Sequence, residues 1–180
     1  MNIQIVQADP TNDELIERLY EYLKANCEFY DFLTYEQFER CRASIYMAFD
    51  LDDNGLTSKI PCGIIGVRRA AINDINIKEL QFYCQPYKLM YYIEFLHFNP
   101  PVLDGQDHSA ELEKGYFDLL GCCLKDKNDG FAAFKKYCPT YNEVAIHDAL
   151  IRNYFLIISM DPKTGVLTYV KEPKMYRYMK

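Results

Sequence analysis

Apolar and aromatic side chains are densest between residues 91 and 98, where they run without a helical period. A run of this length predicts a buried strand. It stops at Asn99-Pro100-Pro101, and a helical spacing begins near Ser109 after a short polar loop. A strand that opens through a loop onto a helix N-terminus is suited to binding an anion, because the first N–H groups of the helix have no partner within it.

Before this stretch, the pattern predicts a strand and a capped helix. Residues 2–7 alternate between apolar and polar side chains, which is typical of a strand. Thr11 and Glu14 form a capping box, and the helix that they begin is expected to run to about Ala25. An aromatic linker follows at residues 29–33.

A second capping box at residues 34–37 begins another helix. Its apolar positions are Phe38, Cys41 and Ile45. Strands are expected at residues 47–49 and 61–70. Gly63 and Gly66 lie inside the second of these strands, where lone glycines indicate a bulge or a close backbone approach.

The segment between these two strands resembles half of a calcium-binding loop. Asp50-Leu51-Asp52-Asp53-Asn54-Gly55 fits the pattern D-x-D-x-N-G, but the twelfth position is Pro61 instead of a bidentate Glu. Strands, not helices, are also expected on both sides. We therefore interpret the segment as a hairpin turn in which Asn54-Gly55 supplies the positive φ angles.

The C-terminal half mixes helices and strands. The spacing predicts a helix from Ser109 to about Leu124 and a short helix at residues 131–137. A strand is expected at 141–146, while the run 149–160 fits a helix or a buried strand and its composition favours a helix. The remaining expected elements are a short helix near 77–83 and a final hairpin formed by 166–170 and 175–179. The order β-α-α-β-β-β-α-β-α-β-β predicts a single α+β domain over residues 1–180.

Composition narrows the functional classes. The chain has 180 residues, of which 49% are hydrophobic, and its net charge of −6 argues against nucleic acid as the main partner. Apolar runs are too short to span a membrane, and residues 1–5 do not resemble a signal peptide. Seven scattered cysteines without a C-x-x-C pair favour reduced thiols, most simply buried, in a cytoplasmic protein.

The element order and several local motifs resemble the GNAT superfamily of acyl-CoA-dependent N-acetyltransferases. Gly63-Ile64-Ile65-Gly66 is similar to the third strand of that family, and Phe98-Asn99-Pro100 is similar to the V-x-P that ends its fourth strand. Asn153, Met160 and Gly165-Val166 resemble its late N…Y…GF pattern. The opening strand and the closing residues 176–180 also resemble the family's first and last strands. The resemblance implies a mixed central sheet flanked by helices, with acetyl-CoA as the cofactor.

The resemblance also implies a set of cofactor-binding residues. They are Phe98, Gly105, Gln106, Asp107, His108, Ser109 and Asn153. The loop at residues 103–110 departs from the family's R/Q-x-x-G-x-G/A, because it keeps one glycine, lacks the Arg and carries two aspartates. Met160 stands where the family often has a Tyr as general acid. Ser109 is most simply a helix N-cap.

Glu94 is the candidate catalytic base, because the family commonly uses a carboxylate beside its fourth strand to deprotonate the amine. A Glu in so apolar a run is suited to this role if it is buried. The alternative is that Glu94 faces solvent or pairs with Arg68 or Arg69. Strand alternation places His97 on the opposite face from Glu94. The three histidines lack the spacing of a zinc site.

Two functional hypotheses remain open at this point. The first is an acyltransferase acting on the amine of a small molecule or a protein, and the acidic net charge favours a cationic acceptor. The aromatics Phe29-Tyr30-Asp31-Phe32, with Tyr91 and Tyr92, either line the acceptor pocket or pack in the core. The second is a catalytically inactive GNAT-like module that binds another protein. A homodimer is compatible with both.

Overall fold

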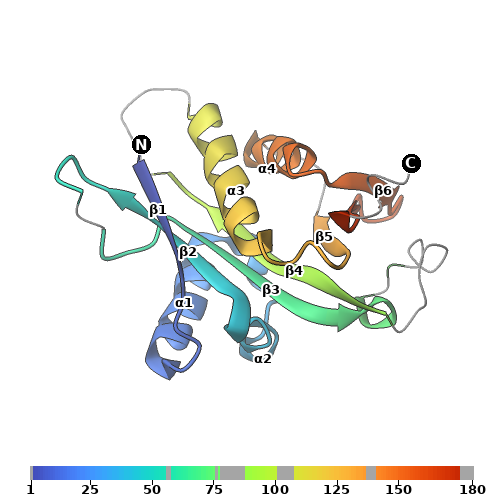
Figure 1. Cartoon of the computed structure of the whole chain (residues 1–180), viewed down its shortest axis with the longest axis horizontal. Coiled ribbons are helices and arrows are strands. Elements are labelled where there is room, and N and C mark those ends of the chain that lie inside the picture. Colours follow the sequence, from blue (N-terminus) through green and yellow to red (C-terminus); the bar gives the residue numbers. More distant parts are fainter. Residues whose placement is uncertain are drawn as a thin grey trace.

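Seven strands form one mixed sheet in the order β1-β2-β3-β4-β5-β7-β6 (Figure 1). The computed structural model describes residues 2–55, 58–75, 77, 88–100, 108–136 and 141–174. The strands are β1 Asn2–Gln7, β2 Ile45–Leu51, β3 Gly63–Ala71, β4 Leu89–Phe98, β5 Ala132–Lys136, β6 Leu156–Met160 and β7 Leu167–Lys171. All neighbouring strands are antiparallel except β4 and β5, which are parallel. The α+β class predicted from the sequence is confirmed.

Helices cover both faces of the sheet. Figure 1 shows α1 and α2 on one side and α3 and α4 on the other. The helices are α1 Asp13–Asn26, α2 Tyr35–Glu39, α3 Ser109–Leu124 and α4 Tyr141–Arg152, with short 3₁₀ turns at Glu28–Tyr30, Arg42–Ser44 and Ile72–Ile75. Each layer has its own apolar core, and Phe95 of β4 belongs to the core under α1 and α2, whereas Leu96 belongs to the core under α3 and α4. No helix among the described residues is long and apolar enough to cross a membrane.

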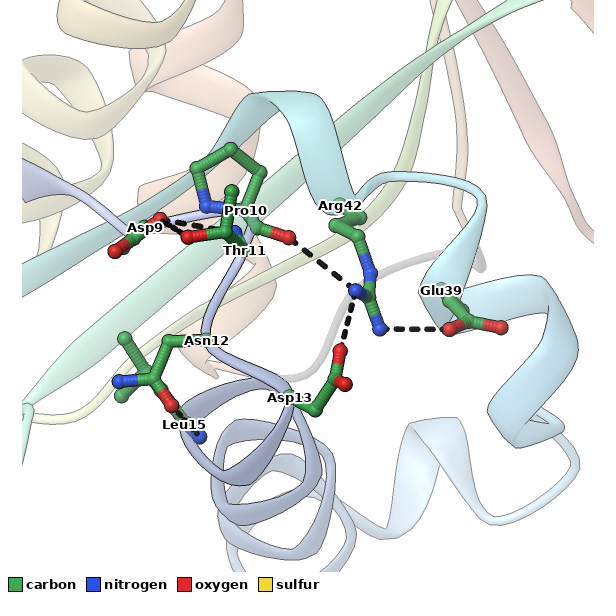
Figure 2. A network of polar contacts seen from close by, with 8 residues as sticks. All are labelled: Asp9, Pro10, Thr11, Asn12, Asp13, Leu15, Glu39 and Arg42. Carbon is green, nitrogen blue, oxygen red and sulfur yellow. Dashed lines mark hydrogen bonds and ion pairs between the residues drawn. The ribbon is translucent and has the colours of Figure 1, made fainter.

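The two helix starts in the N-terminal half are capped differently from each other. Thr34 and Gln37 form the predicted capping box of α2. At α1 the prediction of Thr11 as the cap is wrong, because Asn12 accepts the bond from the backbone of Leu15 and Thr11 instead bonds to Asp9 (Figure 2). The Asn side chain is as good an acceptor for this purpose as a Thr hydroxyl.

Arg42 joins the start of α1 to the segment after α2. Its guanidinium lies 2.6 Å from Asp13 and 2.7 Å from Glu39, and it also donates to the carbonyl of Pro10 (Figure 2). The predicted helix through Ile45 is shorter than expected, because α2 ends at Glu39 and Ile45 is the first residue of β2. These contacts hold the α1–α2 layer together as one unit on its face of the sheet.

A bulge interrupts the pairing of β3 with β4. Gly66 lies opposite Phe95 and Val67 lies opposite Ile93, so Glu94 has no partner across the ladder. The ring of Phe95 covers Gly66, where an added Cβ would lie 2.1 Å from a ring carbon. The glycines of β3 therefore mark a bulge and a close approach, as predicted, although the extra residue belongs to β4.

The bulge reverses the alternation of side chains along β4. Ile93 and Leu96 both belong to the core under α3 and α4, although they are three residues apart. His97 packs against the ring of Tyr22 of α1, and Glu94 meets Arg68 on the same α1–α2 face. The prediction that His97 and Glu94 lie on opposite faces is therefore wrong, because simple alternation does not hold across a bulge.

Several elements of the C-terminal half differ from the sequence expectation. Residues 132–136 form β5 instead of a helix, residues 141–152 form α4 instead of a strand, and residues 156–160 form β6 instead of continuing a helix. Short apolar runs do not distinguish a helix from a strand, and here the tertiary pairing with β7 decides. The predicted strand at 175–179 lies outside the described residues.

Two further predictions concern connecting segments. In the Asp50–Gly55 turn only Gly55 has a positive φ angle, at 75°, and Asn54 does not. Asp52 accepts the backbone N–H groups of Asn54 and Gly55, so the turn is closed by the chain itself. The short helix expected at 77–83 falls almost wholly outside the described residues.

Candidate functional site

Glu94 and Arg68 form a buried ion pair at the bulge. The Nε atom of Arg68 lies 2.5 Å from Oε2 of Glu94, and the two side chains are 15% and 12% exposed. Among the described residues, Oε1 of Glu94 has no hydrogen-bond partner. The carboxylate therefore sits at a bulge, as many functional residues do, and Arg68 holds one of its oxygens.

Aromatic and thiol groups surround this pair on the α1–α2 face. Arg68 lies over the ring of Tyr92, with its Cζ atom 5.4 Å from the ring centroid. Burial, reinforced by the charge of Glu94, raises the pKa of Tyr92 to about 12. Burial raises the pKa of the Cys41 thiol. The charges of Glu94 and Arg68 also act on this thiol, but their effects are smaller and opposite in sign. Both groups are therefore neutral around pH 7, and the pair carries the local charge.

Next to the pair, β4 parts from its parallel neighbour. The described register joins β4 to β5 only through Tyr91 with Ala132 and Tyr92 with Ala133. Beyond these residues the edge of β4 that faced β5 has no strand partner in the described chain. Backbone N–H and C=O groups along such an edge need other partners.

Two tyrosine hydroxyls supply partners along this edge. The hydroxyl of Tyr30 accepts from the N–H of Leu96 at 2.8 Å and lies 3.1 Å from the carbonyl oxygen of the same residue, to which it donates. The hydroxyl of Tyr116 donates to the carbonyl of Phe98 at 3.2 Å. Burial raises the pKa of Tyr30, so this phenol keeps its proton. A single hydroxyl thus satisfies both backbone groups of Leu96.

The predicted cofactor residues are only partly described. Gly105, Gln106 and Asp107 lie outside the described residues. His108 takes the N-cap position of α3, and no side-chain cap bond forms there, so the prediction of Ser109 as the cap is wrong by one residue. Phe98 is 1% exposed, and its ring contacts that of Tyr116 in the core.

Asn153 serves the packing of α4 onto α3. Its side-chain amide donates to the carbonyls of Ala149, at 3.0 Å, and Phe117, at 3.3 Å. The residue after it, Tyr154, has a φ angle of 69°, which a non-glycine residue rarely adopts. Met160, 58% exposed, ends β6. Met160 lies away from β4 in the sheet, because β5 and β7 separate β6 from β4.

The histidines and cysteines do not form a metal site among the described residues. His147 bonds through Nδ1 to the hydroxyl of Tyr169 at 2.9 Å, and His97 lies against Tyr22. Burial raises the pKa of Cys62 to about 11 and that of Cys123 to about 12, as expected for structural thiols. The five described cysteines form no disulfide bond.

Sequence reasoning missed the role of Tyr30 on β4. The aromatics at residues 29–32 were expected to line a pocket or pack in the core, and one of them instead reaches the backbone of a strand 66 residues away. No local pattern carries this information, because the hydroxyl and its partners come from different elements. The pairing of Glu94 with Arg68, which was predicted together with solvent exposure and a pair with Arg69 as the alternative to the base role, is confirmed.

Solved structures with a similar fold are acetyltransferases. NAA60 of Arabidopsis thaliana in complex with acetyl-CoA matches with a TM-score of 0.53 and 14% identity, over 94% of this chain and 97% of that one. An acetyltransferase of the GNAT family from Streptococcus agalactiae matches with a TM-score of 0.53 and 12% identity, over 94% and 95%. A putative arylalkylamine N-acetyltransferase of the yellow fever mosquito matches with a TM-score of 0.56 and 9% identity, over 96% and 88%.

No protein-family model and no curated protein matches the sequence. The structural likeness nevertheless extends over nearly the whole chain. This chain therefore has the fold of the GNAT acetyltransferases, which its sequence motifs predict.

Proposed function

We propose that this protein transfers an acyl group from acetyl-CoA to an amine. The observation that carries the proposal is the position of Glu94, which projects from the bulge of β4 beside the point where β4 leaves β5. The proposal is supported by the structures with the same fold, among which are complexes with acetyl-CoA and CoA.

The edge of β4 is where we place the cofactor. Leu96 has an N–H and a C=O that could pair with an amide of the pantetheine chain, provided that the amide displaces the Tyr30 hydroxyl that now bonds to both. The sixteen-residue helix α3 begins beyond the loop that follows β4, and a helix N-terminus, whose first N–H groups have no acceptor within the helix, suits a phosphate. When bound, acetyl-CoA supplies the activated thioester acyl group.

Glu94 is the residue that we assign to proton removal. An amine is protonated around pH 7 and must lose a proton before it can attack an acyl carbon. Oε1 of Glu94 has no partner among the described residues and can accept that proton directly or through one water. Arg68 holds the other oxygen and so fixes the direction in which the carboxylate points.

The acceptor enters from the α1–α2 face in this proposal. Glu94 and Arg68 lie on that face, and Cys41 after α2 is close to both. Tyr92 adds an aromatic surface beside the carboxylate. Either a small amine or an amine of a protein chain suits such a site, and other proteins of this fold act on polyamines or bind peptides.

The experiment that tests the proposal has two separate measurements. The first is isothermal titration of the protein with acetyl-CoA, for which a dissociation constant in the micromolar range is expected. The second is release of free CoA with a panel of amines, including a polyamine and peptides with free N-termini. Binding together with amine-dependent release supports the proposal. Absence of acetyl-CoA binding overturns it, and binding without release for any amine supports the non-catalytic alternative instead.

A further inference from the structure

A basic cavity lies at the end of β3, where this strand extends beyond the start of β2. Its volume is about 560 Å³. Ile45, the first residue of β2, pairs with Gly66, so the next residues of β3 have no β2 residue beside them. The side chains that matter for its chemistry are Arg40, Arg68, Arg69, Tyr91, Asp126 and Lys127.

The charges around this cavity are unusual for a chain with a net charge of −6. Four cationic side chains and one acidic side chain, Asp126, line it. Two of the cations have carboxylate partners, since Arg40 pairs with Glu36 and Arg68 pairs with Glu94.

The other two cations have only neutral partners in the described chain. Arg69 donates to the hydroxyl of Tyr91 at 2.8 Å and lies over its ring. Lys127 donates to the carbonyl of Cys123 at 2.8 Å. Two acidic groups belong to this region, Asp126 in the lining and Asp129, which accepts from the Tyr91 hydroxyl at 3.1 Å. A cavity with two cations that have no carboxylate partner attracts an anion.

We propose that this cavity binds an anionic group, a carboxylate or a phosphate, carried by the acceptor amine. The identification of the anion as part of the acceptor rests on the proposed function. Arg68 lines the cavity and also pairs with Glu94, so one residue joins the cavity to the candidate base. An anion in the cavity competes with Glu94 for Arg68 and leaves the carboxylate freer to take a proton from the amine.

The binding of an anion is tested without any catalytic activity. The probe is inorganic phosphate, titrated against the protein at constant ionic strength with chloride as the balancing anion, and followed by calorimetry. Binding to the wild type is expected in the millimolar range. Because each cation makes a charge-assisted bond, Arg69→Gln and Lys127→Gln are each expected to weaken it about tenfold.

The matched control is Lys125→Gln, since Lys125 is exposed, lies two residues from Lys127 and does not line this cavity. It is expected to leave the phosphate affinity within about twofold. Glu94→Gln is expected to strengthen phosphate binding several-fold, because it releases Arg68 from its partner. Absence of phosphate-specific binding, or an equal loss in Lys125→Gln, overturns the site.

The source of the anion is tested with two acceptors that differ in one group. Hexylamine and 6-aminohexanoate carry the same primary amine, and only the second carries a carboxylate. The proposal predicts a higher kcat/KM for 6-aminohexanoate, by about tenfold, and loss of this preference in Arg69→Gln. Phosphate binding without any such preference assigns the cavity to a free anion and overturns the acceptor part. Failure of both amines to react, with phosphate still bound, counts against the proposed function and not against the anion site.

Discussion

The hydroxyl of Tyr30 bonds to both backbone groups of Leu96, at 2.8 Å from the nitrogen and 3.1 Å from the oxygen. It occupies the place that a neighbouring strand would have taken, on the side of β4 that β5 has left. We expect Tyr30→Phe to lower the free energy of unfolding by about 2 kcal/mol, since two buried backbone groups lose their partner. Urea denaturation measures this change.

The control for this variant is Tyr20→Phe. The hydroxyl of Tyr20 donates to a single carbonyl, that of Leu33, at 2.8 Å. Its loss is expected to cost about 1 kcal/mol. Equal destabilisation by the two variants would contradict a double role for Tyr30.

The same bonds have a consequence for the cofactor. An amide that pairs with Leu96 must displace the hydroxyl of Tyr30, so the two compete for the same groups. Tyr30→Phe is therefore expected to bind acetyl-CoA more tightly, by up to about tenfold. Calorimetry of both proteins with acetyl-CoA checks this, and a weaker affinity in the variant would show that the hydroxyl supports the cofactor instead.

Removal of the carboxylate at the bulge should affect the reaction and not the cofactor. We expect Glu94→Gln to lower the rate of amine acetylation about a hundredfold or more at pH 7, with an acetyl-CoA affinity within about twofold of the wild type. It also leaves the positive charge of the buried Arg68 without a balancing carboxylate, which costs about 3 kcal/mol of stability. Glu113→Gln is the matched control, because Glu113 pairs with Arg152 on the other face of the sheet.

Two glycines of α3 should respond oppositely to the same substitution. An added Cβ at Gly115 would lie 2.2 Å from the ring of Phe98, whereas at Gly121 the nearest atom is Oδ1 of Asn153 at 3.9 Å. Gly115→Ala is expected to destabilise by about 2 kcal/mol through overpacking. Gly121→Ala is expected to stabilise by about 0.5–1 kcal/mol through helix propensity. Thermal unfolding of the two variants tests the pair.

The buried thiols predict a loss of stability in alkaline solution. Burial raises the pKa of Cys123 from 9.0 to about 12, so the folded protein keeps a proton that the unfolded chain releases above pH 9. The part of the unfolding free energy that comes from this raised pKa is fully present below pH 9. It falls by about 1.4 kcal/mol per pH unit between pH 9 and about 12. The urea concentration at which half of the protein is unfolded should decrease between pH 8 and pH 10.5 under reducing conditions.

Cys123→Ala should show a smaller drop over this pH range than the wild type. Cys122→Ala, at an exposed thiol of the same helix, should show the wild-type drop. Identical pH profiles for the two variants would contradict the assignment to Cys123.

The sequence predicts the regular parts of this fold better than its site. The strand at β4 and the helix at α3 follow from long apolar patterns, and the capping box at Thr34 follows from local chemistry. The region from 131 to 160 is mispredicted, because β5 and β6 become strands through pairing with β7. The local spacing of apolar residues does not show which distant segments pair as strands.

The site depends on contacts of the same distant kind. Glu94 stands out in the sequence because it is a lone charge in an apolar run, and its pairing with Arg68 was foreseeable as one of two choices. The bond from Tyr30 to Leu96 joins residues 66 positions apart. The basic cavity likewise combines residues from four separate parts of the chain, which composition alone cannot bring together.

The unpaired Glu94 is the extra residue of β4 at the bulge. Removing this one residue would restore an unbroken ladder with β3, in which Ile93 and Phe95 become neighbours on opposite faces. Phe95 would stay in the core under α1 and α2, and Leu96 would stay in the core under α3 and α4. A one-residue deletion here would therefore remove the carboxylate and the bulge without changing the register of β4, whereas replacement of the same residue leaves the bulge in place. The length of β4, and not only its composition, is thus part of what places the candidate base beside the point where β4 leaves β5.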